Sequence, residues 1–189
     1  RIVVNMSIGS IMPGLLEAVL VKVLDKGNVV IVAAAGNEGL DHVCFPAGYE
    51  EVIAVGSCEG GSIASYSNYG TEIDIFAPGS FTHMEDHYDA VEGARYTRRL
   101  AMYGTSFACP RVTGVVVEMM RYEPELDTTE IRAVLGRSSR KLKGHDSGRL
   151  YRIKAMSHVS TQYMFRYIAW TATQSIALLL VALVSGVSV

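Results

Sequence analysis

The chain has 189 residues, of which 49% are apolar, and its formal net charge is −2 at pH 7. This length and composition predict one sizeable hydrophobic core, and they exclude a disordered chain. The near-neutral charge excludes the broad basic surface that nucleic-acid binding requires, so we expect no nucleic-acid partner.

Short apolar runs and one amphipathic segment predict the first elements of the fold. Residues 2–8 and 29–35 are apolar at successive positions, which is typical of strands in a parallel sheet that is covered on both faces. Between them, residues 14–26 repeat apolar side chains at helical spacing. Residues 51–57 and 72–76 predict two further strands. This alternation of strands and helices indicates the α/β class.

The following part of the chain contains one irregular segment and two predicted helices. Residues 80–103 are rich in charge and tyrosine, and we expect them to form a long surface loop. Residues 106–121 are apolar around most of a helical circumference, which predicts a buried helix. The next helix should begin near Asp127, which forms a capping-box pattern with Glu130, and should end near Gly136.

A serine stands at the start of the apolar helix, within residues 104–110 (GTSFACP). Because a helix N-terminus offers unpaired N–H groups and a partial positive charge, an oxyanion that forms beside Ser106 would be stabilised. The alternative is that Ser106 only caps its helix. Asn37 follows a predicted strand, at the end of an open α/β sheet where ligands bind. A simple turn role for Asn37 is the corresponding alternative.

Residues 104–110 resemble the nucleophile motif G-T-S-x-A-x-P of the subtilisin-like serine proteases. Other segments resemble this family in the same order: residues 5–9 (NMSIG), 33–37 (AAAGN), 45–56 (FPAGYEEVIAVG), 66–70 (YSNYG) and 76–79 (FAPG). The similarity spans about residues 2–143. It implies that residues 1–150 are the C-terminal half of a subtilase catalytic domain, which is a three-layer sandwich with a mostly parallel sheet. The N-terminal part of that domain would lie upstream.

This resemblance implies a serine endopeptidase that acts on polypeptides. Ser106 would be the nucleophile, and Asn37 would donate a hydrogen bond to the oxyanion. The family supplies the activating histidine and aspartate from motifs that do not occur in these 189 residues. None of the five histidines here stands in such a motif. We therefore expect the histidine and aspartate upstream, and expect this chain alone to be inactive.

The resemblance also implies a specificity pocket. The expected walls are Ser7, Ile8 and Gly9 on one side and Ala34, Ala35 and Gly36 on the other. Cys44 stands where the family often has a glycine at the pocket floor, so its side chain should shorten the pocket. Glu38 and Asp41 near the rim would favour a basic or polar substrate residue.

No cofactor is required by this chemistry, and no metal-ligating set of side chains is evident. Some family members bind a weakly held calcium ion at backbone carbonyls of the turn that corresponds to residues 47–52, and this chain could keep that ion. The three cysteines have no metal-site spacing. A disulfide between Cys44 and Cys58 and three buried free thiols are both open, with free thiols favoured.

The last 22 residues, 168–189, carry no charge and have about the length that a membrane-spanning helix needs. They predict a transmembrane helix after a linker over residues 151–167, and a buried terminal helix is the alternative. We expect a membrane-associated protein of the secretory pathway or the extracellular face. The basic residues before the tail instead favour a cytoplasmic domain, so the orientation stays open.

Two other functions compete with an active peptidase. One is a catalytically inactive, membrane-tethered binding module that keeps the substrate groove. The other is an unrelated doubly wound domain in which Ser106 is only a cap. The latter predicts that Asn37 and Ser106 lie far apart.

Overall fold

The computed structural model describes residues 1–10, 15–24, 27–89, 91–143, 145–150, 155 and 159. The tail predicted over residues 168–189 and most of the predicted linker over 151–167 lie outside these residues. Ala155 and Val159, which fall within the predicted linker, are helical and buried in the core. None of the helices in the described residues is long and apolar enough to cross a membrane.

One sheet organises the fold, with strand order β1-β2-β3-β5-β9-β8 and β4 paired to β3. Its strands are β1 (Ile2–Met6), β2 (Val29–Ala34), β3 (Ile53–Glu59), β4 (Ser62–Ile63), β5 (Ile75–Pro78), β8 (Arg140–Leu142) and β9 (His145–Arg149). The pairs from β1 through β2, β3 and β5 to β9 are parallel, and the pairs that involve β4 and β8 are antiparallel. The predicted mostly parallel sheet is confirmed.

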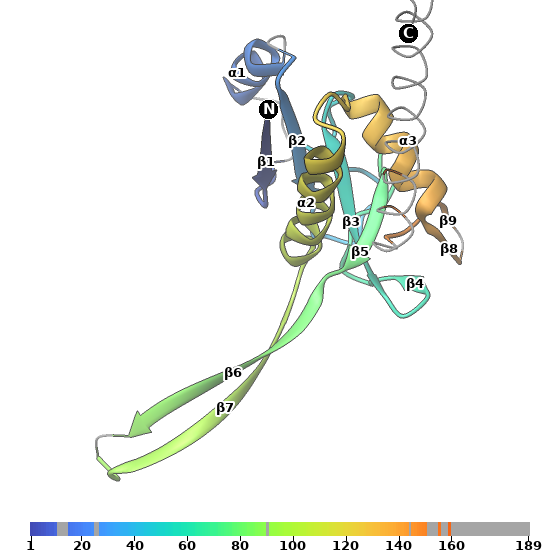
Figure 1. Cartoon of the computed structure of the whole chain (residues 1–189). Coiled ribbons are helices and arrows are strands. Elements are labelled where there is room, and N and C mark those ends of the chain that lie inside the picture. The colour runs from blue at the N-terminus through green and yellow to red at the C-terminus, as the bar shows by residue number, and fades with distance from the viewer. Residues whose placement is uncertain are drawn as a thin grey trace, which may run out of the picture.

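Helices cover both faces of this sheet (Figure 1). Helix α1 (Leu15–Leu24) lies on one face, while α2 (Thr105–Tyr122) and α3 (Thr128–Ser138) lie on the other. Successive residues of β2 therefore enter two cores in turn. Val30, Val32 and Ala34 pack with α2 and α3, and Ile31, Ala33 and Ala35 pack on the side of Leu20 in α1. Burial on both sides explains the uninterrupted apolar run in the sequence, and it confirms the three-layer α/β sandwich.

The two predicted helices after the irregular segment also form. In α3, the Asp127 carboxylate accepts a hydrogen bond from the Glu130 N–H at 2.8 Å, and the Glu130 carboxylate accepts one from the Asp127 N–H at 3.1 Å. This is the predicted capping box. Helix α2 buries most of its apolar residues against the sheet, although Val117 stays 41% exposed.

The prediction of a surface loop over residues 80–103 was wrong. This segment is a β-hairpin, in which β6 (Ser80–Asp89) and β7 (Ala94–Tyr103) pair along all ten positions and extend away from the sandwich (Figure 1). Asp89 closes the turn, because its carboxylate accepts hydrogen bonds from the N–H groups of Val91 and Glu92. Both faces of the hairpin are largely exposed, so the strands lack the apolar alternation by which half-buried strands are recognised.

The three cysteines are buried free thiols in the structure. This agrees with the favoured prediction and not with a disulfide between Cys44 and Cys58. Burial raises the pKa of the Cys109 thiol to about 11, and the neutral thiol donates to the carbonyl oxygen of Val32 at 3.3 Å. Cys109 therefore packs as a small apolar residue between α2 and β2.

Candidate active site

The end of β2 and the first turn of α2 meet at the carboxyl edge of the sheet. The side-chain carbonyl of Asn37 accepts hydrogen bonds from the Thr105 N–H at 2.7 Å and from the Thr105 hydroxyl at 2.9 Å. Asn37 thus contacts the residue that directly precedes Ser106. The alternative of an unrelated domain, in which Asn37 and Ser106 lie far apart, is therefore wrong.

These contacts fix the orientation of the Asn37 amide. A backbone N–H can only donate, so the atom that faces Thr105 must be the carbonyl oxygen and not the nitrogen. The Asn37 side chain is exposed, and among the described residues no group accepts a hydrogen bond from its NH₂ group. Two oriented donors therefore remain available beside the start of α2.

Gly104 and Gly79 allow this close approach. Gly104 has a φ of +150°, a conformation that side chains disfavour, and its N–H donates to the Gly79 carbonyl at 2.9 Å. A Cβ atom on Gly79 would lie 2.1 Å from the hydroxyl of Ser57. The chain can therefore enter α2 at Thr105 only because both positions lack a side chain.

Pro110 leaves the Ser106 carbonyl free to bond with Ser7, which follows β1. Proline has no N–H, so the carbonyl of Ser106 four residues earlier loses its helical partner. The Ser7 hydroxyl donates to that carbonyl instead, at 3.0 Å. The Ser106 hydroxyl in turn lies 3.5 Å from the Ser7 carbonyl oxygen, and Ser106 is partly exposed. The proline inside the helix thus helps to hold the serine against the segment that follows β1.

No histidine among the described residues forms a hydrogen bond with Ser106. His145 contacts the Gly70 carbonyl through Nε2 at 3.1 Å, and His87 pairs with Glu85 at 2.9 Å. The described residues also contain no group of three or more histidine, cysteine or acidic side chains that could hold a metal ion. They therefore supply a serine and an oriented amide, without a base for the serine.

The two predicted walls of the specificity pocket lie on either side of Cys44. A Cβ atom on Gly9 would lie 3.1 Å from Cys44 Cβ, and one on Gly36 would lie 2.7 Å from Cys44 Sγ. The walls are held together because the Cys44 N–H donates to Ala35 O at 2.8 Å, and Ser10 pairs with Phe45 through two backbone hydrogen bonds. Cys44 itself is 4% exposed.

The remaining wall residues differ in exposure. Ala34 and Ala35 are buried at the end of β2, Ser7 is half-buried and Ile8 is 57% exposed. The Glu38 carboxylate lies 3.7 Å from Cys44 Sγ. Burial, and then the Glu38 charge, raise the pKa of the Cys44 thiol, which keeps it neutral near pH 7.

Asn68 has no predicted role, although it lies in the segment YSNYG at residues 66–70 that resembles the family. The structure buries it fully and surrounds it with hydrogen-bond partners from residues 35–40. The signal in the sequence was a polar amide between Ser67 and an aromatic residue, which is also an ordinary turn pattern. Only the fold shows that this side chain faces the loop that carries Asn37.

A positive charge lies beside the turn at residues 47–52, where a weakly bound calcium ion is possible. The guanidinium of Arg132 donates to the Val52 carbonyl at 2.7 Å and lies 3.0 Å from the Asp74 carboxylate. The carbonyls of Pro46 and Tyr49 accept backbone N–H groups. A calcium ion beside Val52 would face the Arg132 guanidinium, and a calcium ion at this turn stays a prediction.

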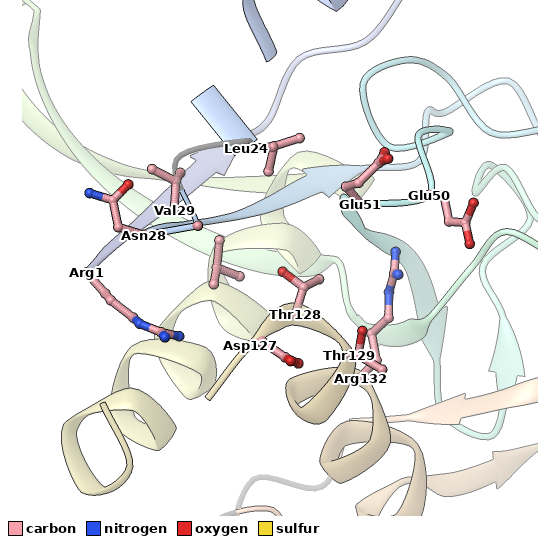
Figure 2. Close-up of a pocket in the computed structure, with 12 residues that line it drawn as sticks. Arg1, Leu24, Asn28, Val29, Glu50, Glu51, Asp127, Thr128, Thr129 and Arg132 are labelled. Carbon is pink, nitrogen blue, oxygen red and sulfur yellow. The ribbon is translucent and has the colours of Figure 1, made fainter. Parts of the chain in front are cut away.

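A separate cavity of about 480 Å³ opens at the opposite end of β2 (Figure 2). Arg1, Asn28, Glu51, Asp127 and Arg132 are among its lining residues. Charges of both signs face this space, and none of the predicted site residues lies there. The cavity is therefore distinct from the candidate site at the carboxyl edge of the sheet.

The chain matches a known protein family and several of its members. A model of the subtilase family matches residues 1–153. The thermophilic serine proteinase of Bacillus sp. (strain AK1) is 40% identical over 121 residues, which are 64% of this chain and 27% of that protein. The major intracellular serine protease of Bacillus subtilis (strain 168) is 37% identical over 131 residues, which are 65% of this chain and 38% of that protein. The chain thus spans less than half the length of either relative.

Solved structures show the same similarity. A protease from Pseudoalteromonas arctica PAMC 21717 superposes with a TM-score of 0.66 at 25% identity, over 83% of this chain and 51% of that chain. The self-cleaved protease domain of PatA superposes with a TM-score of 0.64 at 30% identity, over 84% of this chain and 62% of that chain. Both similarities extend across most of the described residues.

Proposed function

The chain belongs to the subtilase family, and on this premise we propose that it forms part of a serine endopeptidase in which Ser106 attacks the scissile carbonyl. The observation that carries this proposal is the contact between Asn37 and Thr105, which sets an oriented amide beside the start of α2. A nucleophile and an oxyanion donor must lie this close to act on one carbonyl group.

In the proposed reaction, the Ser106 hydroxyl loses its proton to a histidine as it attacks, and an aspartate orients that histidine. We propose that both residues come from an upstream segment of the protein. The Asn37 NH₂ group and the Ser106 N–H donate to the oxyanion of the tetrahedral intermediate. The histidine then protonates the leaving amine, and water repeats the sequence on the acyl-enzyme.

We propose that the polypeptide substrate binds along residues 7–9 and 34–36. Residues 7–9 follow β1, lie outside any strand and are at least partly exposed, and an extended peptide can add to such a backbone through hydrogen bonds. The side chain before the scissile bond would enter the space that ends at Cys44. The side chains of Glu38 and Asp41 would set the charge at its rim.

Peptide hydrolysis by the intact protein tests the function. The intact protein should cleave an unstructured polypeptide, and residues 1–189 alone should not, because the described residues supply no base for Ser106. A catalytically inactive, membrane-tethered binding module that keeps the substrate groove is the second candidate. If the intact protein binds peptides in this groove and cleaves none of them, the module is the correct function.

Replacing Cys44 with glycine should deepen the specificity pocket. Because the Cys44 side chain fills the space between Gly9 and Gly36, the variant should accept larger side chains before the scissile bond. We expect the ratio of kcat/KM for a phenylalanine substrate to that for an alanine substrate to rise by about tenfold. Cys58→Ala is the matched control, because Cys58 is also a buried thiol but lies in β3, outside the predicted pocket, and it should leave the ratio unchanged. An unchanged ratio in Cys44→Gly would show that Cys44 does not form the pocket floor.

We further propose that residues 168–189 anchor the protein in a membrane of the secretory pathway or on the extracellular face. The support is the run of 22 uncharged residues. Alkaline extraction of membranes should leave the intact protein in the pellet and should release a version that ends at residue 167. Release of both proteins would contradict the anchor.

A further inference from the structure

We propose that Asn68 is the positioning residue that holds Asn37 in place for catalysis. This inference rests on the proposed peptidase function, in which Asn37 donates to the oxyanion. Asn68 does not contact the reacting atoms in this account. It acts through the backbone on both sides of Asn37.

The Asn68 side chain is bonded to the loop that carries Asn37. Its Oδ1 atom accepts hydrogen bonds from the Glu38 N–H at 3.0 Å and from the Leu40 N–H at 3.1 Å. Its Nδ2 atom donates to the Ala35 carbonyl at 3.2 Å. These contacts lie before and after Asn37, so they fix the path of the loop on both sides of it.

Two more contacts tighten this arrangement. The Asn68 backbone N–H donates to the Gly36 carbonyl at 3.1 Å. Asn68 Nδ2 also donates to the Glu38 carboxylate at 2.8 Å, and the same carboxylate oxygen accepts from the Asn37 N–H at 2.9 Å. Asn68 therefore reaches the backbone of Asn37 through one shared carboxylate.

The surroundings of the Asn68 side chain require both a donor and an acceptor, which an amide provides. Asn68 is 0% exposed, so the polar atoms of its own side chain are removed from water and depend on these partners. A leucine would lose every side-chain bond, and an aspartate would set a second carboxylate beside that of Glu38. Gly36, with a φ of +112°, makes room for this contact, since a Cβ atom there would lie 2.3 Å from Asn68 Nδ2.

Asn68 is itself held by the central sheet. The Ser67 hydroxyl accepts a hydrogen bond from the Ser57 N–H in β3 at 2.8 Å and donates to the Asn68 carbonyl at 2.9 Å. A continuous set of hydrogen bonds thus runs from buried β3 to the Asn37 loop. Thr105 holds the Asn37 side chain from the opposite side, at the start of α2. Asn37 is therefore fixed between β3 and α2.

Loss of this support should reduce catalysis more than substrate binding. An oxyanion donor acts mainly in the transition state, so a misplaced Asn37 lowers kcat and leaves KM almost unchanged. We expect Asn68→Leu in the intact protein to lower kcat by about 10- to 100-fold. KM should rise by a smaller factor, because Asn68 also bonds to Ala35, Gly36 and Cys44 of the proposed pocket.

A double-mutant cycle with Asn37→Ala separates positioning from a general structural role. If Asn68 acts through Asn37, then Asn68→Leu should change kcat by less than about threefold in the Asn37→Ala background. If the two losses multiply instead, Asn68 does not act through Asn37 and the inference is overturned. Should Asn68→Leu fail to fold, Asn68→Asp takes its place in the cycle, because it keeps the acceptor for Glu38 and Leu40.

A matched control accounts for lost stability. Ile131→Val removes a buried methylene in α3, away from the Asn37 loop, and should lower the melting temperature while leaving kcat unchanged at an assay temperature where the variants are folded. An equal fall in kcat in this control would overturn the positioning role. If the intact protein is active and needs Ser106 and Asn37, a multiplicative cycle refutes the Asn68 inference alone. If it cleaves no peptide, the proposed function fails and the inference fails with it.

Discussion

Replacing Ser106 with alanine in the intact protein is expected to lower kcat by about 10⁶-fold with little change in KM. This size of effect is the one established for the nucleophile of subtilisin, a family member, and is taken over from it. The substitution removes only a hydroxyl that lies 3.5 Å from the Ser7 carbonyl oxygen, so folding should be preserved. Steady-state hydrolysis of a chromogenic peptide measures the loss, and the melting temperature confirms that the variant is folded.

Ser62→Ala provides the control for this result. Ser62 is an exposed serine in β4, distant from α2 in the sequence, and its loss should leave kcat unchanged. If Ser106→Ala retains the activity of the unaltered protein, Ser106 is not the nucleophile and the peptidase proposal is wrong.

Replacing Asn37 with aspartate is expected to lower kcat by at least about 10²-fold, again with KM nearly unchanged. Loss of one such donor costs about 10² to 10³ in subtilisin, from which this magnitude is taken over. Aspartate has the same shape and can still accept both hydrogen bonds from Thr105, so the loop should keep its position. It has no NH₂ group to offer the oxyanion, and its negative charge opposes the one that develops there.

This variant also distinguishes the two interpretations of Asn37. If the residue serves only to join the loop to α2, Asn37→Asp should be almost fully active, because the acceptor oxygens remain. If Asn37 stabilises the oxyanion, Asn37→Asp should be at least as impaired as Asn37→Ala. Parallel measurement of kcat for both variants, with their melting temperatures, decides between them.

Much of the sandwich could be predicted because its signals are local. The apolar run over residues 29–35 reflects burial of β2 on both faces, and the spacing of Asp127 and Glu130 encodes the capping box directly. The hairpin formed by β6 and β7 could not be recognised in the same way. Its two strands are stabilised by pairing with each other, and neither has a buried face that would impose an alternating pattern.

The sequence predicts candidate site residues but not their contacts. The order of the motifs predicts Ser106 and Asn37 as catalytic residues and Cys44 as the pocket floor, and these roles stay predictions. The hydrogen bonds of Asn37 and Asn68 depend on the fold. Thr105 and Asn37 are 68 positions apart in the chain, and Asn68 and Glu38 are 30 positions apart. Hydrogen bonds over such separations leave no pattern in a single sequence.

The proline inside α2, Pro110, is explained by a tertiary contact. A proline inside a helix removes a hydrogen bond and would ordinarily weaken α2. Here the Ser106 carbonyl that it leaves free accepts the Ser7 hydroxyl. The same residue that interrupts the helix therefore ties the proposed nucleophile to the proposed substrate-binding segment.

Labelling with an active-site serine phosphonate tests the central claim most directly. The intact protein should be modified once, and mass spectrometry should locate the phosphonate on Ser106, with no label on Ser106→Ala or on the denatured protein. Absence of any label on folded intact protein, or a label on a different serine, would contradict the account.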